Sequence, residues 1–372
     1  MAKRPAPVPA GPLPVSLAGV GVALPPYPLD TSGLREVLAR LWPQRASHLP
    51  TLLRELTGSR RWLVRPPGEL HQRLSLSDQT AAYGRFATPL AAAACRTALT
   101  AAGVGAATVD LLVVASCTGF CLPGPDAQLV DQLGLRPDVT RLPLTQLGCA
   151  GGAAGLARAA EWLRGAGRGR MALVAAVELP SLTLQPDDDS LDNLLSALVF
   201  GDAAGAAVLV GPGGPPPAGG AQAPVVLRTR EWLAPGTADA LGFGLDDRGF
   251  RVRLARDLPR QLAALMPEVV ARFLAPGAVA ELEVVAVHPG GPRVISAAAA
   301  ALGAAPRAVA ASRAAFRRAS NPSSAAIFVV LDELAAGRHH PGPGAHGLLL
   351  GVGPGLTLEL VELRWPGARV SA

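Results

Sequence analysis

The 372-residue sequence is poor in lysine, in aromatic residues and in cysteine. Lys3 is the single lysine, and phenylalanine, tryptophan and tyrosine together make up 4% of the chain. The positive charge therefore comes from arginine, which is used heavily alongside alanine, glycine and proline, as in GC-rich bacterial coding. Because of this bias, the abundance of arginine is not by itself evidence of a function.

Four cysteines occur, at positions 95, 117, 121 and 149, and they exclude two classes of protein. They are too few for the disulfide framework of a small secreted domain. They also lack the paired spacing, with histidines nearby, of a zinc site. Unpaired cysteines favour a reducing compartment, so we expect a cytoplasmic protein without a metal site.

Long apolar runs are also missing. Prolines at positions 5, 7, 9, 12 and 14 interrupt the N-terminal stretch, which we interpret as a short disordered lead, and no apolar segment reaches membrane length. The net charge of +6 is modest, and no run of arginines alternates with aromatic residues. We therefore expect no membrane and no nucleic-acid partner. An anionic small molecule suits the arginines better, although a merely basic surface also explains most of them.

What the sequence does contain is one order of elements that occurs twice, in residues 1–210 and 225–372. In each block a helix leads to an apolar strand, then to a loop, a helix of small residues and further strands. Residues 211–224 (GPGGPPPAGGAQAP) separate the blocks and have no hydrophobic periodicity, which predicts a linker. The repeated order predicts a duplicated α/β unit in which two central helices meet between outer layers.

Apolar periodicity and stop signals place the individual elements. The predicted strands are 15–23, 109–116, 171–178, 204–210, 225–232, 250–254, 282–287, 347–351 and 356–364. The predicted helices are 34–41, 88–102, 127–133, a helix that opens at Cys149, 191–199, 258–273, 294–302 and 325–335.

Cys149 stands where a helix begins, in the stretch LPLTQLGCAGGAAGLARAAEWL at 142–163. Gly151, Gly152 and Gly155 are poor helix formers, so we expect another backbone to pack very close to the first turns. The unpaired N–H groups and the dipole of a helix N-terminus favour a thiolate, which makes Cys149 a candidate nucleophile. A buried structural thiol fits this stretch alone equally well.

Two polar residues occupy comparable places in the second block. His288, in HPGG, follows a buried strand, where open α/β sheets place their sites, and Asn321 opens the second small-residue helix. A cysteine with a histidine can transfer acyl groups, and an asparagine adds a neutral N–H donor for an oxyanion or enolate. Taken singly, His288 also fits a strand end and Asn321 an ordinary helix cap. Phe200 and Phe243 likewise fit an ordinary core.

Five segments together resemble the type III polyketide synthases, the chalcone-synthase-like members of the thiolase superfamily. The resemblance extends from about Val15 to Trp365 in one order. It implies a thiolase-like five-layered αβαβα fold built from two pseudo-repeats, a homodimer, CoA thioesters as substrates, and neither a metal nor a bound cofactor. The segments are GCAGGAAG at 148–155, FGDAAGAAVLVG at 200–211, HPGGPRVI at 288–295, SNPSSAAIFVVLDEL at 320–334 and GVGPGLTLELVEL at 351–363.

The resemblance also implies roles for single residues. Cys149 matches the nucleophile that accepts the acyl group. His288 and Asn321 match the pair that holds the thioester carbonyl and the enolate formed from malonyl-CoA. Phe200 matches a gatekeeper between the CoA tunnel and the cavity, and Leu122 matches a residue that crosses the dimer interface.

Further residues fall at positions that the family uses around its substrate. Gly353 belongs to a glycine loop, 351–355, beside which the substrate approaches the backbone. Positions that line the growing-chain cavity are held by Cys117, Glu178, Thr183, Phe243 and Ser323. Candidates for binding the CoA phosphates are Arg54, Arg60 and Arg61.

This resemblance implies an acyltransferase. A starter loads onto Cys149, malonyl-CoA decarboxylates to an enolate that extends the chain, and the chain cyclises after several rounds. The segments SCTGF at 116–120, LPLTQLGCAGGAA at 142–154 and SLTLQPDD at 181–188 are most similar to bacterial tetrahydroxynaphthalene synthases, which use malonyl-CoA as starter and extender.

Phe243 departs from that branch, which has a tyrosine at this position. Without the hydroxyl, a hydrogen-bonding group that could orient a polar malonyl starter is lost. A fatty acyl-CoA starter, giving an alkylpyrone or alkylresorcinol, is therefore the alternative. A non-catalytic acyl-binding paralogue is expected to lose its nucleophile, which is present here. A ketoacyl-carrier-protein synthase is disfavoured by the FGD and GVGPG contexts.

Overall fold

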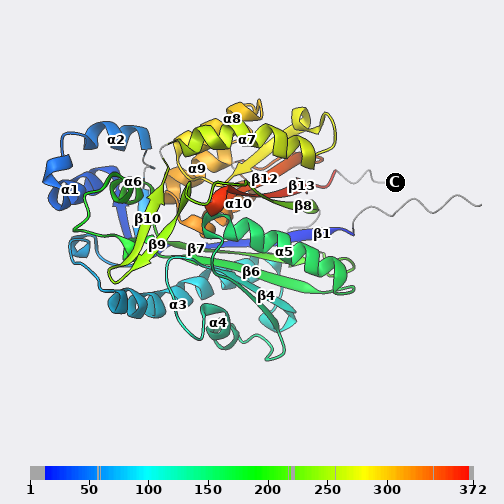
Figure 1. The fold of residues 1–372 in the computed structure, drawn as a ribbon. Helices are drawn as coiled ribbons and strands as arrows, with labels where there is room; N and C mark the ends of the chain where they lie inside the picture. Colours follow the sequence, from blue (N-terminus) through cyan, green and yellow to red (C-terminus); the bar gives the residue numbers. More distant parts are fainter. Residues whose placement is uncertain are drawn as a thin grey trace, which may run out of the picture.

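A computed structural model describes residues 13–367, except residues 57, 59, 217, 219–222, 256 and 338. The predicted N-terminal lead, residues 1–12, and part of the predicted linker lie outside the described residues. Figure 1 shows strands running through the middle of the molecule, with helices on both sides and between them. In this described part, no helix is long and apolar enough to span a lipid bilayer.

Nine strands form one hydrogen-bonded series within the described residues. They are β1 Val15–Ala23, β4 Leu111–Ala115, β5 Thr140–Leu144, β6 Met171–Glu178, β7 Ala203–Val210, β8 Val225–Leu233, β11 Leu282–Val287, β12 His346–Gly353 and β13 Thr357–Arg364. Their order in space is β11-β12-β13-β8-β1-β7-β6-β4-β5.

The two halves of this series have the same topology, apart from β5, which pairs in parallel with β4 at one edge. From the middle outward, β1–β7 and β7–β6 are antiparallel and β6–β4 is parallel. The second half repeats this sequence of pairings, with β8–β13 and β13–β12 antiparallel and β12–β11 parallel. The halves meet through only two residue pairs, Val15 with Val226 and Ser16 with Val225. The predicted α/β fold with two pseudo-repeats is therefore confirmed.

Two helices lie between the sheet halves and the others cover them. Both α5 (Gly151–Gly165) and α10 (Ala326–Ala335) belong to the central apolar core, which also takes residues from the inner faces of both sheet halves. The outer face of the first half packs against α3 (Leu76–Ala102). The outer face of the second packs against α7 (Leu258–Phe273) and α8 (Pro292–Ala301). This order gives five layers, αβαβα.

The glycines of α5 permit the close approach that the sequence predicts. A Cβ at Gly152 would lie 2.2 Å from the backbone oxygen of Ser324, just before α10, and a Cβ at Gly151 would lie 3.3 Å from the Cβ of the same serine. At Gly155 the neighbour is instead the sheet, because a Cβ there would lie 2.8 Å from Val174. Two of the three glycines therefore pack against the equivalent helix start, and the third packs against β6.

Most predicted elements agree with the structure to within three residues, but α3 is much longer than predicted. It begins at Leu76 instead of residue 88, because Ser75 and Asp78 form a capping box. Pro89 lies inside the helix, whose last turn ends at the left-handed Gly103. The polar residues of the first three turns obscured the apolar periodicity of this helix.

A smaller set of elements covers one end of the layers, at the left of Figure 1. Its apolar core joins α1, α2 and α6, and a hairpin of β9 and β10 lies beside α6. Their bounds are β2 Tyr27–Asp30, α1 Thr31–Leu41, α2 Leu49–Leu56, β3 Arg60–Leu63, α6 Leu191–Val199, β9 Leu241–Asp246 and β10 Gly249–Leu254. Two further helices are α4 Pro125–Leu133 and α9 Ala310–Ala319.

Candidate active site

One pocket brings together residues from both halves and from the covering elements. Its wall contains Cys149, His288 and Asn321. Phe200 also lines it, as the sequence predicts. The rest of the wall is apolar or glycine and consists of Leu195, Val199, Leu241, Leu254, Leu258, Gly290, Val294 and Val352.

Cys149 lies in a single 3₁₀ turn, Gly148–Ala150, which leads into α5. Gly148 has a φ of +50°, and a Cβ there would lie 2.5 Å from the ring of Pro354, so glycine is required. The thiol of Cys149 is buried and donates to Oγ of Ser323 at 3.4 Å. The turn thus places the sulfur against the start of the equivalent helix in the other half.

His288 follows β11 directly. Its backbone N–H donates to Leu350 O at 2.7 Å, and its own carbonyl accepts from Gly290 N at 2.8 Å, which fixes the turn. The ring is buried, and its Nδ1 has no hydrogen-bond partner among the described residues. Burial lowers the pKa of His288 to about 3. The imidazole is therefore neutral in this state and is available to a bound substrate.

Asn321 is held in place by three hydrogen bonds. Its N–H donates to Val199 O at 3.0 Å, its carbonyl accepts from Gly201 N at 3.2 Å, and its side-chain Oδ1 accepts from Ser323 N at 2.9 Å. The flanking residues Ser320 and Ser323 have φ values of +57° and +43°, an uncommon conformation for serine. Because Oδ1 is engaged, the NH₂ group of Asn321 is the donor that remains for a ligand.

The predicted thiolate at Cys149 is wrong for this state of the pocket. Burial, together with the nearby Glu178, raises the pKa of the thiol to about 12, although hydrogen bonds with Ser323 and Asn321 act to lower it. The first turn is 3₁₀, and α5 itself begins two residues later, so the dipole acts less directly than predicted. A neutral thiol and a neutral imidazole therefore share the pocket in this state.

Glu178 lies behind Cys149 and not on the cavity wall where we expected it. The side chain is fully buried and accepts from Cys117 N at 3.1 Å, from Thr118 Oγ1 at 2.6 Å and from the hydroxyl of Ser324. Burial raises its pKa. Glu178 therefore ties the end of β6 and the loop after β4 to the start of α10.

Cys117 and Ser323 both lie beside Cys149. The Cys117 sulfur is 3.6 Å from Ser323 Oγ and 3.4 Å from Oε1 of Glu178. Since the Cys149 thiol contacts the same serine hydroxyl, Ser323 connects the two cysteines. Both predicted cavity residues are thus placed next to the pocket.

Other predicted site residues lie away from the pocket wall in this chain. Thr183 is buried and donates to Pro180 O, and Phe243 on β9 packs edge-on against Phe250 at 6.0 Å. Gly353 allows close packing instead of touching the pocket, because a Cβ there would lie 2.6 Å from the Cβ of Ala150. Leu122 is 87% exposed on the loop between β4 and α4.

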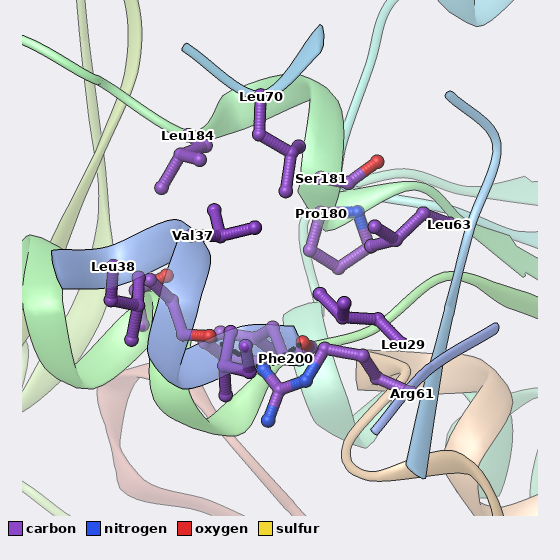
Figure 2. Close-up of a pocket in the computed structure, with 13 residues that line it drawn as sticks. Leu29, Val37, Leu38, Arg61, Leu63, Leu70, Pro180, Ser181, Leu184 and Phe200 are labelled. Atoms are coloured by element: carbon purple, nitrogen blue, oxygen red, sulfur yellow. Dashed lines mark hydrogen bonds between the residues drawn. The ribbon is translucent and has the colours of Figure 1, made fainter. Parts of the chain in front are cut away.

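Arg61 is not a CoA-phosphate residue, contrary to one of our expectations. Its side chain is buried, and its guanidinium donates to the carbonyls of Ala197 at 2.5 Å, Leu198 at 2.6 Å and Phe200 at 3.0 Å. Figure 2 shows the guanidinium beside Phe200, in the wall of a second, mainly apolar cavity. Arg61 therefore caps the C-terminus of α6. The other two candidates, Arg54 and Arg60, are exposed.

The structure shows a cavity beside the pocket that the sequence does not predict, and we call it the entrance cavity. It shares Leu195, Val199, Leu254, Leu258, Gly290 and Val294 with the pocket. Arg293, directly after the HPGGP segment, also lines this cavity. Its position within the HPGGPRVI segment is the one feature of the sequence that could have indicated Arg293 as a site residue. No comparable motif marks the apolar residues of the cavity wall, because they come from four separate elements.

Comparisons with known proteins agree with this architecture. Two family models match, chalcone and stilbene synthases, N-terminal domain, over residues 69–215, and chalcone and stilbene synthases, C-terminal domain, over residues 226–365. A 1,3,6,8-tetrahydroxynaphthalene synthase from Streptomyces peucetius subsp. caesius is 38% identical over 358 residues, which cover 94% of this chain and 93% of that protein. A phloroglucinol synthase from Pseudomonas fluorescens is 30% identical over 308 residues, covering 82% and 85%.

Solved structures agree as well. The crystal structure of 1,3,6,8-tetrahydroxynaphthalene synthase from Streptomyces coelicolor A3(2), a bacterial type III polyketide synthase, matches with a TM-score of 0.87 at 29% identity. The match covers 95% of this chain and 100% of the other. The match thus extends over both halves of the chain.

Proposed function

This chain belongs to the chalcone and stilbene synthase family, the type III polyketide synthases, and on that premise we propose that it makes 1,3,6,8-tetrahydroxynaphthalene or a close relative from malonyl-CoA alone. The observation that carries the proposal is that Cys149, His288 and Asn321, from three separate segments, line one pocket. Their chemistry is that of a nucleophile, a base and a neutral donor.

Loading begins with proton transfer from the Cys149 thiol to the neutral imidazole of His288. Each group is held in its neutral form by burial, so the thiolate and the imidazolium form together, where their opposite charges stabilise each other. The thiolate then attacks the thioester carbonyl, and the bond from that carbon to the CoA sulfur breaks. The departing CoA thiolate takes the proton from the imidazolium, and an acyl group remains on Cys149.

Extension uses the same two donors. Malonyl-CoA loses carbon dioxide, and the electron pair of the broken C–C bond becomes an enolate. The enolate oxygen accepts hydrogen bonds from the ring N–H of His288 and from the NH₂ group of Asn321. The hydrogen bond from Ser323 N to Oδ1 fixes the orientation of the Asn321 amide. The enolate carbon attacks the acyl group and releases Cys149. Transfer of the longer chain from CoA back to Cys149 prepares the next round.

The proposal extends to the assembly and its setting. We propose a homodimer, because Phe120 and Leu122 expose 66% and 87% of their surface on one loop, which follows β4 next to the edge strand β5. We propose a cytoplasmic location, because the four cysteines are free. We propose that no cofactor takes part, since side chains of the pocket supply the donors that the enolate needs. Each half supplies different residues of the proposed site: residues 1–210 contain Cys149, and residues 225–372 contain His288 and Asn321.

The test is incubation of the purified protein with malonyl-CoA as the sole substrate. We expect release of carbon dioxide and CoA together with an aromatic product that oxidises to a coloured, flaviolin-like naphthoquinone. Absence of turnover unless a fatty acyl-CoA is added would contradict the proposal and would indicate an alkylpyrone or alkylresorcinol synthase. Absence of turnover with any acyl-CoA starter would indicate a non-catalytic acyl-binding paralogue.

A further inference from the structure

The entrance cavity is suited to the part of a CoA thioester that stays outside the pocket. It continues from the pocket of Cys149 along Leu195, Val199, Leu254 and Leu258. Its outer wall is the turn from Gly290 to Val294, which begins α8. Among the described residues that line it, Arg293 alone carries a charge.

Arg293 is already paired with an anion. Its guanidinium forms an ion pair and a hydrogen bond with the carboxylate of Glu55, which lies on α2. The pair connects α2 to α8 beside the entrance, and both side chains are partly exposed, at 62% for Arg293 and 42% for Glu55. A ligand that enters from solvent can therefore reach the arginine by displacing the glutamate.

The surroundings of Arg293 favour an anion over a neutral group. Arg293 is in the first turn of the ten-residue helix α8, which starts at Pro292 and has no side-chain cap. An uncapped helix N-terminus carries partial positive charge, and a guanidinium adds a full charge with paired donors that match a phosphate. Glu55 thus occupies a place whose chemistry suits a phosphate group.

We infer that Arg293 binds a phosphate of the CoA thioester and that Glu55 is an internal competitor that must leave when the substrate binds. This inference rests on the proposed function for the identity of the ligand. It predicts effects of opposite sign at the two partners. Loss of Arg293 removes a contact to the substrate, whereas loss of the Glu55 charge removes a competitor. A purely structural ion pair would instead make both substitutions harmful.

The experiment compares the variants Arg293→Gln and Glu55→Gln with Arg272→Gln, which removes an arginine from an exposed ion pair with Glu268 at the far end of α7. Leu258, at the entrance, and Arg272 are separated by about 20 Å along this helix. Arg54→Gln tests the neighbouring arginine of α2. Each variant is assayed with malonyl-CoA and with malonyl-N-acetylcysteamine, a thioester that has no phosphate.

We expect Arg293→Gln to raise KM for malonyl-CoA about tenfold, the effect of losing a charge-assisted hydrogen bond. Glu55→Gln should lower KM about threefold, the effect of losing an exposed ion pair. Neither variant should change KM for malonyl-N-acetylcysteamine. The control Arg272→Gln should leave KM unchanged for both thioesters. The inference is overturned if Glu55→Gln raises KM, if both thioesters respond equally, or if Arg54→Gln has the large effect and Arg293→Gln none.

A binding measurement separates this inference from the proposed function. Calorimetric titration of the full chain with CoA and with pantetheine, which lacks the phosphates, needs no turnover. Weaker binding of CoA to Arg293→Gln, with no change for pantetheine, supports the phosphate site even if malonyl-CoA alone is not converted. Equal affinities of the wild type and Arg293→Gln for CoA would contradict it.

Discussion

The two halves of the molecule share a strand order, yet the starts of their central helices have different chemistry. In the first half the 3₁₀ turn before α5 carries Cys149 and is followed by glycines. In the second half the turn before α10 begins at Ser323, which has a positive φ like Ser320, and it lies just after Asn321. The common topology brings the two turns into contact, and local residues place a thiol at one and the amide of Asn321 beside the other.

The halves also differ in how they bury a carboxylate. Glu178, at the end of β6, accepts hydrogen bonds from the backbone and side chains around it. Glu359, on β13, is equally inaccessible, but neither of its oxygens has a hydrogen-bond partner among the described residues. Arg158 Nη2 lies 3.5 Å from Oε1, and this ion pair lowers the pKa of Glu359 less than burial raises it. The first half uses its buried acid to hold the site together, whereas the second carries one that is poorly paired.

The contact between the two helix starts can be broken directly with Gly152→Leu. The new side chain would begin 2.2 Å from Ser324 O, which is backbone and cannot rotate away. We expect no soluble folded protein, or a loss of unfolding free energy above about 3 kcal/mol in urea titration. Gly105→Ala is the matched control, because a Cβ there meets nothing within 4 Å. A Gly152→Leu protein as stable as this control would contradict the packing.

The division of chemistry between the halves is tested by Asn321→Ala. Loss of a donor to a developing enolate should lower malonyl-CoA decarboxylation about 10²–10³-fold. Transfer of a preformed acyl group to Cys149 should change much less, since the proton transfer of that step takes place between Cys149 and His288. Thr183→Ala serves as the control, because its hydroxyl is bonded to Pro180 O away from the pocket wall. An equal loss in both steps would indicate general damage to the pocket.

The poorly paired acid of the second half predicts a pH dependence of stability. Burial raises the pKa of Glu359 to about 8 from 4.5, so the folded state holds a proton that the unfolded state has lost between these pH values. The unfolding free energy should therefore fall as pH rises from about 5 to 8, by about 1.4 kcal/mol per unit from this group. Glu359→Gln should remove that slope relative to the wild type, measured by urea unfolding at several pH values. An unchanged slope would contradict the raised pKa.

A smaller effect is expected at Arg61, which holds the strand-like segment from Val199 to Gly201 that pairs with Asn321. Arg61→Gln should lower decarboxylation about tenfold by freeing the carbonyls that position this segment. The effect should fall on kcat more than on KM, and Arg61→Lys should restore part of it. Arg272→Gln, which removes an exposed, ion-paired arginine at the far end of α7, is the control and should be neutral. Equal effects of the Arg61 variant and of the control variant would contradict a positioning role for Arg61.

The parts of the fold and of the site that the sequence predicts correctly are those marked by hydrophobic periodicity or by a motif. Strands β1 and β6 and helices α6 and α7 have their predicted ends, because apolar runs and stop residues mark both limits. The convergence of Cys149, His288 and Asn321 was also predictable, since the repeated order of elements places the two helix starts opposite each other. These successes all rest on local patterns or on their repetition.

What the sequence could not predict depends on burial and on long-range contacts. Arg61 reads as a surface arginine until α6 is placed over it, and only then do its three carbonyl partners exist. The pKa of Cys149 follows from the depth of the pocket, which no local motif specifies. The start of α3 at Leu76 is marked in the sequence by its capping box, but apolar periodicity, on which the prediction rests, is absent from the first turns of this helix.

The central claim is that the pocket between the halves uses Cys149 to carry the growing chain. Mass spectrometry of protein quenched during turnover of malonyl-CoA, followed by peptide mapping, tests this directly. We predict acyl adducts on the peptide that contains Cys149, their absence in Cys149→Ala, and their persistence in Cys95→Ala, which alters a buried thiol on α3. Adducts confined to another residue, or continued condensation by Cys149→Ala, would contradict the account.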